Sequence, residues 1–245
     1  MEGRVKEYIL IADIGKKRDY FALMLFHDNA RIEGGNKVLE TPDRIIHRYD
    51  ITNIEQYQGF DYDEMAARIA VIMENPRLKN NAELVVDGTG VGDAVISVLR
   101  KRGLYPIPII FTGGKTATDN YTKMGEVFTG ASGKLAGARV LESISVPKKD
   151  LVDAGIVLVQ QGRIAVAPGK WKDRFLQQLA GFKEKFNERT GKKKYEAEDE
   201  ALHDDLVVCY LMGAWWILNR KDRNAIEERR LEQSRETGWE PADYM

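Results

Sequence analysis

The chain has 245 residues, of which 43% are hydrophobic, and a net charge of −1 from 37 Lys and Arg against 38 Asp and Glu. No apolar run approaches the roughly 18 residues that a membrane-spanning helix requires, so the composition predicts a soluble intracellular protein without a membrane partner. A single cysteine, Cys209, excludes an intrachain disulfide and a zinc site made of cysteines alone.

The first part of the chain is predicted to be extended. Residues 8–12 and 20–27 are apolar runs separated by a short polar turn, so the two strands must be antiparallel. After a Gly-containing loop at 31–36, a third strand is expected at 44–51.

The pattern then changes to alternating helices and strands. Apolar residues at three- and four-residue spacing predict an amphipathic helix over 61–75, which Pro76 ends. A buried strand at 83–87, a helix at about 93–102 and a strand at 106–111 form a β-α-β unit. Together these elements predict an α/β fold with a mixed sheet of about five strands, three antiparallel and then parallel, flanked by helices.

The second half of the chain is predicted to be mainly helical, and the Gly- and Thr-rich stretch at 112–132 is predicted to be a loop or irregular hairpin. The remaining elements are a helix that begins at 146–150 and runs to about 161, an edge strand at 162–167, helices at about 171–188 and 200–219, a basic link at 191–194 between them, and a charged helix or tail over 220–245. Since no repeat or linker is visible, we expect one domain over 1–245, with its core at about 5–219.

Aspartates stand at the ends of two predicted strands and at the start of the last helix. Asp13 ends the first strand, Asp87 ends the fourth, and Asp204 and Asp205 open the helix. Carboxylates at the ends of neighbouring parallel strands meet at one edge of the sheet, where a helix can add a third. Such a cluster needs a counter-charge, which Mg²⁺ or Mn²⁺ supplies, and two such ions promote phosphodiester cleavage. Each aspartate taken alone is more often a turn residue or a helix cap than a metal ligand.

Five short motifs occur in a characteristic order along the chain. They are Asp13-Ile-Gly, Val-Val-Asp87-Gly-Thr-Gly-Val-Gly, Val-Pro-Lys-Lys-Asp-Leu-Val at 146–152, Gly-Arg-Ile-Ala-Val-Ala-Pro at 162–168, and His203-Asp-Asp-Leu-Val-Val. In this order they resemble the nuclease domain of the large terminase subunits of tailed bacteriophages. The resemblance implies an RNase H-like fold, related to the junction resolvases, and a metal-dependent endonuclease that cuts concatemeric viral DNA during genome packaging.

The resemblance also implies the site residues and the partners. Asp13 and Asp87 would bind two Mg²⁺ or Mn²⁺ ions together with Asp205 or Asp204, of which Asp205 is favoured as the principal ligand. The implied partners are double-stranded DNA, the terminase ATPase domain, the small terminase subunit and the portal, in the cytoplasm of the infected host cell. The chain matches the nuclease half only, because Gly113-Gly-Lys-Thr116 lacks the first glycine of a phosphate-binding loop and follows the fifth predicted strand.

Lys115, Lys148 and Lys149 are candidate contacts to DNA phosphates. The near-neutral total charge argues at first against a nucleic-acid partner, but the charges are segregated. Residues 168–194 hold nine Lys or Arg and three Asp or Glu, whereas residues 196–205 hold six acids and no Lys or Arg. Separate basic and acidic stretches suit a nuclease that binds phosphates beside a metal.

The residues alone leave three other interpretations open. An ATP-binding module of the actin and sugar-kinase type uses Asp-x-Gly loops for phosphates, as at 13–15 and 87–90, although such proteins are usually longer. Another RNase H-like nuclease, such as a junction resolvase, would use the same carboxylates. A non-enzymatic module that binds DNA or docks to a motor would use the aspartates only as capping residues.

Overall fold

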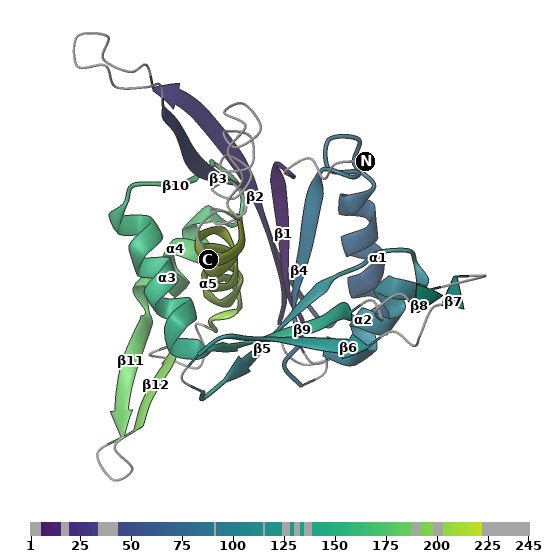
Figure 1. The fold of residues 1–245 in the computed structure, drawn as a ribbon. Helices are drawn as coiled ribbons and strands as arrows, with labels where there is room; N and C mark the ends of the chain where they lie inside the picture. The colour runs from purple at the N-terminus through teal and green to yellow at the C-terminus, as the bar shows by residue number, and fades with distance from the viewer. Residues whose placement is uncertain are drawn as a thin grey trace, which may run out of the picture.

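The computed structural model describes residues 6–15, 20–33, 44–90, 92–114, 116–123, 128–129, 133–134, 139–187, 192–197 and 203–221. An eight-stranded mixed sheet lies at the centre and has helices on both faces (Figure 1). The strands of this sheet, in their spatial order, are β10 Ile164–Val166, β3 Arg44–Gln58, β2 Tyr20–Glu33, β1 Tyr8–Asp13, β4 Ala82–Asp87, β5 Ile107–Thr112, β9 Arg139–Pro147 and β6 Thr118–Lys123. Two small hairpins lie apart from it: β7 Phe128–Thr129 with β8 Gly133–Lys134, and β11 Phe182–Asn187 with β12 Lys192–Ala197.

The strand directions agree with the predicted fold class. β1, β2 and β3 are antiparallel neighbours, whereas β4 lies parallel to β1 and β5 lies parallel to β4. The central residues of β1 and β4, at 9–12 and 84–86, are apolar because helices cover both faces of the sheet there. The α/β class with a mixed sheet, three antiparallel strands followed by parallel strands, is therefore confirmed.

The sheet is wider than the five strands expected from the sequence. β10 pairs with β3 at one edge, as predicted, but β9 and β6 add two strands at the other edge. β6 falls inside the predicted loop at 112–132 because its sequence, TDNYTK, lacks the apolar alternation of a half-buried strand. The prediction of a loop at 31–36 is also wrong for its first three residues, because residues 31–33 continue β2.

The prediction of one long helix at about 171–188 is wrong beyond residue 180, where the helix ends. Gly181 is the C-cap of the helix, and β11 and β12 then form an antiparallel hairpin that includes the predicted basic link. Phe182 and Phe186 are four residues apart, a spacing that fits one face of a helix and one face of a strand equally well. Pairing with β12 decides between the two, and the hairpin projects at the lower left of Figure 1.

Five α-helices in the described part of the chain cover the sheet. They are α1 Tyr62–Met73, α2 Gly92–Lys101, α3 Lys148–Gln160, α4 Lys172–Ala180 and α5 Asp205–Trp216, and a short π-helix, Ile217–Lys221, continues α5. α1 and α2 pack on one face of the sheet, and α3, α4 and α5 pack on the other (Figure 1). None of the described helices is long and apolar enough to cross a membrane.

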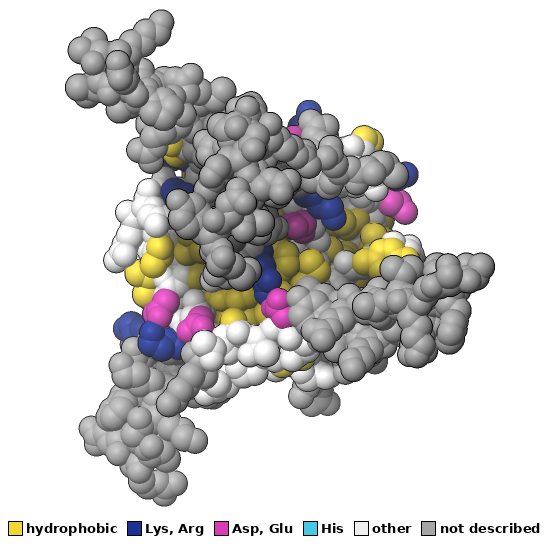
Figure 2. Space-filling model, viewed as in Figure 1, with side chains coloured by type: hydrophobic (Ala, Val, Ile, Leu, Met, Phe, Trp, Pro, Cys, Tyr) yellow, Lys and Arg dark blue, Asp and Glu magenta, His cyan; other side chains and the backbone are white. Residues whose placement is uncertain are grey.

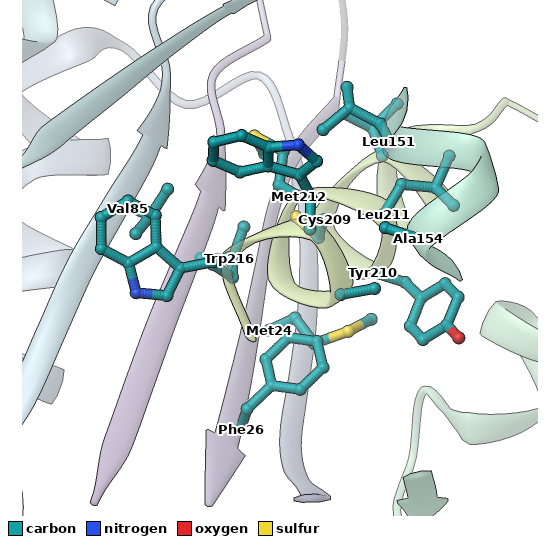
Figure 3. Close-up of a cluster of buried hydrophobic side chains, with 14 of the residues drawn as sticks. Met24, Phe26, Val85, Leu151, Ala154, Cys209, Tyr210, Leu211, Met212 and Trp216 are labelled. Carbon is teal, nitrogen blue, oxygen red and sulfur yellow. The ribbon is translucent and has the colours of Figure 1, made fainter. Parts of the chain in front are cut away.

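α5 is the central helix of its layer, since residues 206–216 are all buried. It lies between the sheet and α3, and Figure 3 shows its side chains reaching both neighbours. The sheet approaches α5 closely at Gly213, where an added Cβ atom would lie 2.4 Å from the ring of Phe26. Glycine at this position therefore sets the distance between α5 and β2, and with it the position of the start of the helix.

We expect Gly213→Ala to lower the free energy of unfolding by about 1–3 kcal/mol, because the Phe26 ring must move out of a close-packed core. Chemical denaturation with circular dichroism measures this change. Gly169→Ala is the matched control, since no atom lies within 4 Å of its added Cβ and the residue is exposed. Equal stability of the two variants would show that the core at Phe26 is not tightly packed.

Candidate active site

The sheet brings Asp13 and Asp87 together at one edge. Each is the last residue of its strand, and the two strands are parallel neighbours paired through Ala12 and Val86, the residues immediately before the two aspartates. The strand ends meet the start of α5, which carries Asp204 and Asp205. All four predicted aspartates are therefore described, and each of the other three acts electrostatically on Asp13.

Asp13 has the most perturbed carboxyl group of the four. Desolvation by burial raises its pKa well above the ordinary value, and repulsion from Asp87, Asp205 and Asp204 raises the pKa further, in that order. A hydrogen bond between the side chains of Asp13 and Asp87 also favours the protonated form of Asp13. Two carboxyl groups can share a hydrogen bond only if one of them is protonated, so this contact opposes full ionisation of the cluster in the absence of a cation.

Asp87 is held by the loop that follows β4. The backbone N–H of Thr89 donates a 2.7 Å hydrogen bond to its Oδ1 atom, and the Thr89 hydroxyl also bonds to the carboxylate. The Thr89 Oγ1 atom in turn accepts from the backbone N–H of Phe111, at 3.0 Å. Burial raises the pKa of Asp87, and the bonds to Thr89 partly oppose this.

The two glycines of the Asp-Gly-Thr-Gly motif, Gly88 and Gly90, are each required for a different structural reason. A Cβ atom on Gly88 would lie 2.9 Å from the Cβ of Pro108, so a side chain there would collide with β5. Gly90 has a φ of +80°, a conformation that other residues rarely adopt. Both glycines let the loop turn sharply and keep Thr89 next to Asp87.

Asp205 is the first residue of α5, and Asp204 precedes it as the N-cap residue. Burial raises the pKa of Asp205 to about 6, and the negative charge of Asp204 contributes to this shift. The Nε2 atom of Gln56 donates a 3.1 Å hydrogen bond to Oδ2 of Asp205. His203 packs edge-on against the ring of Tyr20, and this contact fixes the chain just before the helix.

The three candidate DNA-binding lysines have different environments. Lys148, at the start of α3, is half-buried and lies close enough to Asp87 to lower the pKa of that carboxyl group. Lys149 is exposed and forms an ion pair with Asp153 one turn along the helix. Lys115 lies outside the described residues. The structure therefore brings one of the three lysines, Lys148, to the aspartate cluster.

A groove of about 590 Å³ lies beside the second half of β3. β10 pairs with β3 only at residues 49–51, and the groove is lined by residues 51–58 of β3 and by residues 167–172. Gln56, one of the lining residues, also donates a hydrogen bond to Asp205, although none of the four aspartates lines the groove itself. Lys170 and Lys172 place positive charge on its wall.

The chemistry of the cluster fits a hard divalent cation. Its donors are carboxylate oxygens, which Mg²⁺ and Mn²⁺ prefer, and burial raises the pKa values of Asp13, Asp87 and Asp205, so a bound cation would favour their ionised forms. Within the described residues, no three such side chains converge closely enough to form a ready-made metal site. Binding would therefore require the carboxylates to be ionised and to draw closer.

Sequence reasoning missed several residues that support the aspartates. Thr89 lies two residues after Asp87 in the Asp-Gly-Thr-Gly motif, and this spacing is the signal that predicts its contact with the carboxylate. Cys209, which lies on α5 one turn after Asp205, is hydrogen-bonded to the backbone of Asp13. Gln56 and Gln178 carry no local signal, since only the folded chain brings them to the start of α5.

The sheet order, the strand-end aspartates and the acidic start of α5 define an RNase H-like domain of the nuclease type. The sequence profile of the Terminase RNaseH-like domain matches residues 12–211, a range that includes all four aspartates. The chain belongs to this family of terminase nuclease domains. No curated protein matches the chain.

Proposed function

We propose that this domain is a metal-dependent DNA endonuclease that cuts concatemeric viral DNA during genome packaging. The observation that carries the proposal is the burial of Asp13 at one sheet edge beside Asp87, Asp205 and Asp204, whose negative charges raise its pKa further. A protein retains so unfavourable a cluster where function requires it. The family supports DNA as the substrate, because a terminase is a DNA-packaging enzyme.

In this proposal Asp13, Asp87 and Asp205 hold Mg²⁺ or Mn²⁺, and Asp204 assists. When bound, two such ions would supply the positive charge that activates water and stabilises the leaving oxygen of the phosphodiester. The protein contributes the orientation of the ligands: Thr89 fixes the Asp87 carboxylate, and Asp13 must be ionised to act as a ligand, which a nearby cation would favour.

Lys148 is proposed as the phosphate contact nearest to the site, with Lys149 and Lys115 further along the DNA. Figure 2 shows basic and acidic side chains together at the lower left, over the end of α3 where the helix begins. Lys149 would exchange its ion pair with Asp153 for a phosphate. The groove beside β3, with Lys170 and Lys172, offers a continuation of the DNA path.

The remaining parts of the proposal follow the family. The 1–245 chain is proposed to act as one nuclease domain in the cytoplasm of the infected host cell. Its proposed partners are the terminase ATPase domain, the small terminase subunit and the portal.

A plasmid-nicking assay with Mn²⁺ or Mg²⁺ tests the proposed function. We expect conversion of supercoiled plasmid to nicked and linear forms, and complete loss of this conversion with a chelator. Calorimetric titration of the protein with Mn²⁺ gives an independent measure of metal binding. Intact plasmid together with ATP hydrolysis would instead favour the ATP-binding module.

We expect Lys148→Ala to weaken binding to duplex DNA and to lower the slope of log affinity against log salt by about one. The reason is that one phosphate contact releases about one counterion when it forms. Fluorescence anisotropy with a labelled duplex over a salt series measures both quantities. Lys79→Ala is the control, since Lys79 is exposed in the segment between α1 and β4. An unchanged slope for Lys148→Ala would rule out contact with phosphate.

A further inference from the structure

We propose that two buried glutamines, Gln56 and Gln178, are positioning residues for the metal ligands on α5. Gln178 caps the helix in place of Asp204, so that the Asp204 carboxylate stays free for a divalent cation, and Gln56 fixes the orientation of the Asp205 carboxylate. This inference rests on the proposed function and assigns roles to two residues that contact no reacting atom.

The helix cap at the start of α5 comes from another helix. Gln178 lies on α4 with no exposed surface, and its Oε1 atom accepts a 3.0 Å hydrogen bond from the backbone N–H of Leu206. Leu206 is the second residue of α5, and its N–H is one of the groups that an N-cap side chain ordinarily satisfies. Gln178 therefore occupies the capping position from outside the helix.

Asp204 has the residue type and the position of an N-cap but makes no capping bond through its side chain. Aspartate is among the residues most favoured for capping, because its carboxylate readily accepts from the first backbone N–H groups. With Leu206 already bonded to Gln178, the Asp204 carboxylate instead acts on Asp13 and Asp205. The capping and ligand roles, which would compete for one carboxylate, are divided between two residues.

Burial of Gln178 has a cost that packing alone does not explain. Its Nε2 atom is buried and has no hydrogen-bond partner in the described part of the chain. A methionine would fill a similar volume without an unpaired N–H group, so a purely structural position would favour it. Retention of the amide points to the use of its oxygen at Leu206.

Gln56 contacts the start of α5 from the sheet, whereas Gln178 contacts it from α4. Gln56 is 3% exposed and faces Ala22 across β2 and β3, while Ala22 faces Asp13 across β2 and β1. The three residues form a row across the sheet, so their side chains share the face that α5 covers. Gln56 can therefore reach both the Asp13 edge of the sheet and the Asp205 carboxylate.

The neutral amide of Gln56 suits this role. A lysine or arginine at the same place would orient Asp205 but would also neutralise it, and so compete with the metal for the negative charge. An amide N–H fixes one carboxylate oxygen and leaves the charge available. Hydrogen bonds of this kind to metal ligands commonly change metal affinity or activity about 10- to 100-fold.

Two variants that remove the hydrogen bonds without changing volume test the inference. We expect Gln178→Met and Gln56→Met each to weaken Mn²⁺ binding about tenfold, measured by calorimetry, and to lower the single-turnover cleavage rate at saturating DNA by about 10- to 100-fold. For Gln178→Met, whose residue lies outside the groove beside β3, the affinity for DNA should not change. Gln177→Met, on the exposed side of α4, is the matched control and should match the wild type in Mn²⁺ affinity and cleavage.

A double-mutant cycle separates positioning from a merely structural role. Asp204→Asn should weaken Mn²⁺ binding in the wild type but have little further effect in Gln178→Met, where the Asp204 carboxylate turns to cap α5. Lower thermal stability of Gln178→Met and Gln56→Met with unchanged Mn²⁺ affinity would overturn the inference and leave the proposed function intact. A wild-type protein that neither binds Mn²⁺ nor cleaves DNA would overturn both.

Discussion

Asp13→Asn is expected to abolish DNA cleavage and, at the same time, to stabilise the metal-free protein. The loss of activity should reach about 10³-fold, because a metal ligand contributes several kcal/mol to the transition state. Stability should rise by about 1–2 kcal/mol at neutral pH, since the substitution removes a desolvated carboxyl group that three neighbouring aspartates repel. A gain in stability with a loss of activity is typical of a residue kept for function.

Two measurements check this prediction, namely nicking in the presence of Mn²⁺ and chemical denaturation without metal. Asp28→Asn is the matched control, because the Asp28 side chain is only 8% exposed but is stabilised by His47 and by Lys221, which is 4% exposed. That variant should be less stable by about 3–5 kcal/mol, since it leaves a buried cation without its partner, yet it should retain cleavage wherever it is folded. Full cleavage by a correctly folded Asp13→Asn protein would disprove the ligand assignment.

The metal-free protein is expected to become less stable as the pH rises from about 4 through 6. Asp205 has a folded-state pKa of about 6 against an ordinary value of 3.8, so the folded state binds more protons than the unfolded state in this interval. Stability then falls with rising pH, by about 3 kcal/mol for Asp205 alone at 1.36 kcal/mol per pKa unit. The raised pKa values of Asp13 and Asp87 act in the same direction.

Two other carboxylates have the opposite effect at lower pH. Hydrogen bonds and nearby positive charge lower the pKa of Asp28, through His47 and Lys221, and the pKa of Glu55, largely through Arg68, although burial opposes both shifts. Their contributions to stability are present above the ordinary pKa values and are lost as the pH falls below them. The metal-free protein should therefore be most stable at about pH 4–5.

Thermal denaturation over a pH series, with and without Mn²⁺, tests this profile. Added Mn²⁺ should remove most of the loss above pH 6, because it binds the ionised carboxylates of the folded state, and at 100 times its dissociation constant it adds about 2.7 kcal/mol. Asp13→Asn should show a smaller pH dependence and a weaker response to Mn²⁺. A metal-free stability that rises steadily between pH 4 and 7 would contradict the raised pKa values.

The sequence alone determined the elements whose local pattern agrees with their final environment. The apolar run of β1 is buried on both faces, the three- and four-residue spacing of α1 matches the face it packs on the sheet, and each signal needs only neighbouring residues. The aspartates at the strand ends could be singled out for the same reason, since a strand that stops at an acidic residue is visible in the sequence.

Only the tertiary structure decided the elements and contacts that depend on residues far apart in the chain. β6 is a strand because β9 pairs with it, and Phe182 begins a strand rather than extending α4 because β12 lies beside it. Gln56 reaches Asp205 across 149 residues, and Gln178 reaches Leu206 from a different helix. The residue types of the site were therefore visible in the sequence, but their support was not, because a hydrogen bond between distant segments leaves no periodic pattern in either one.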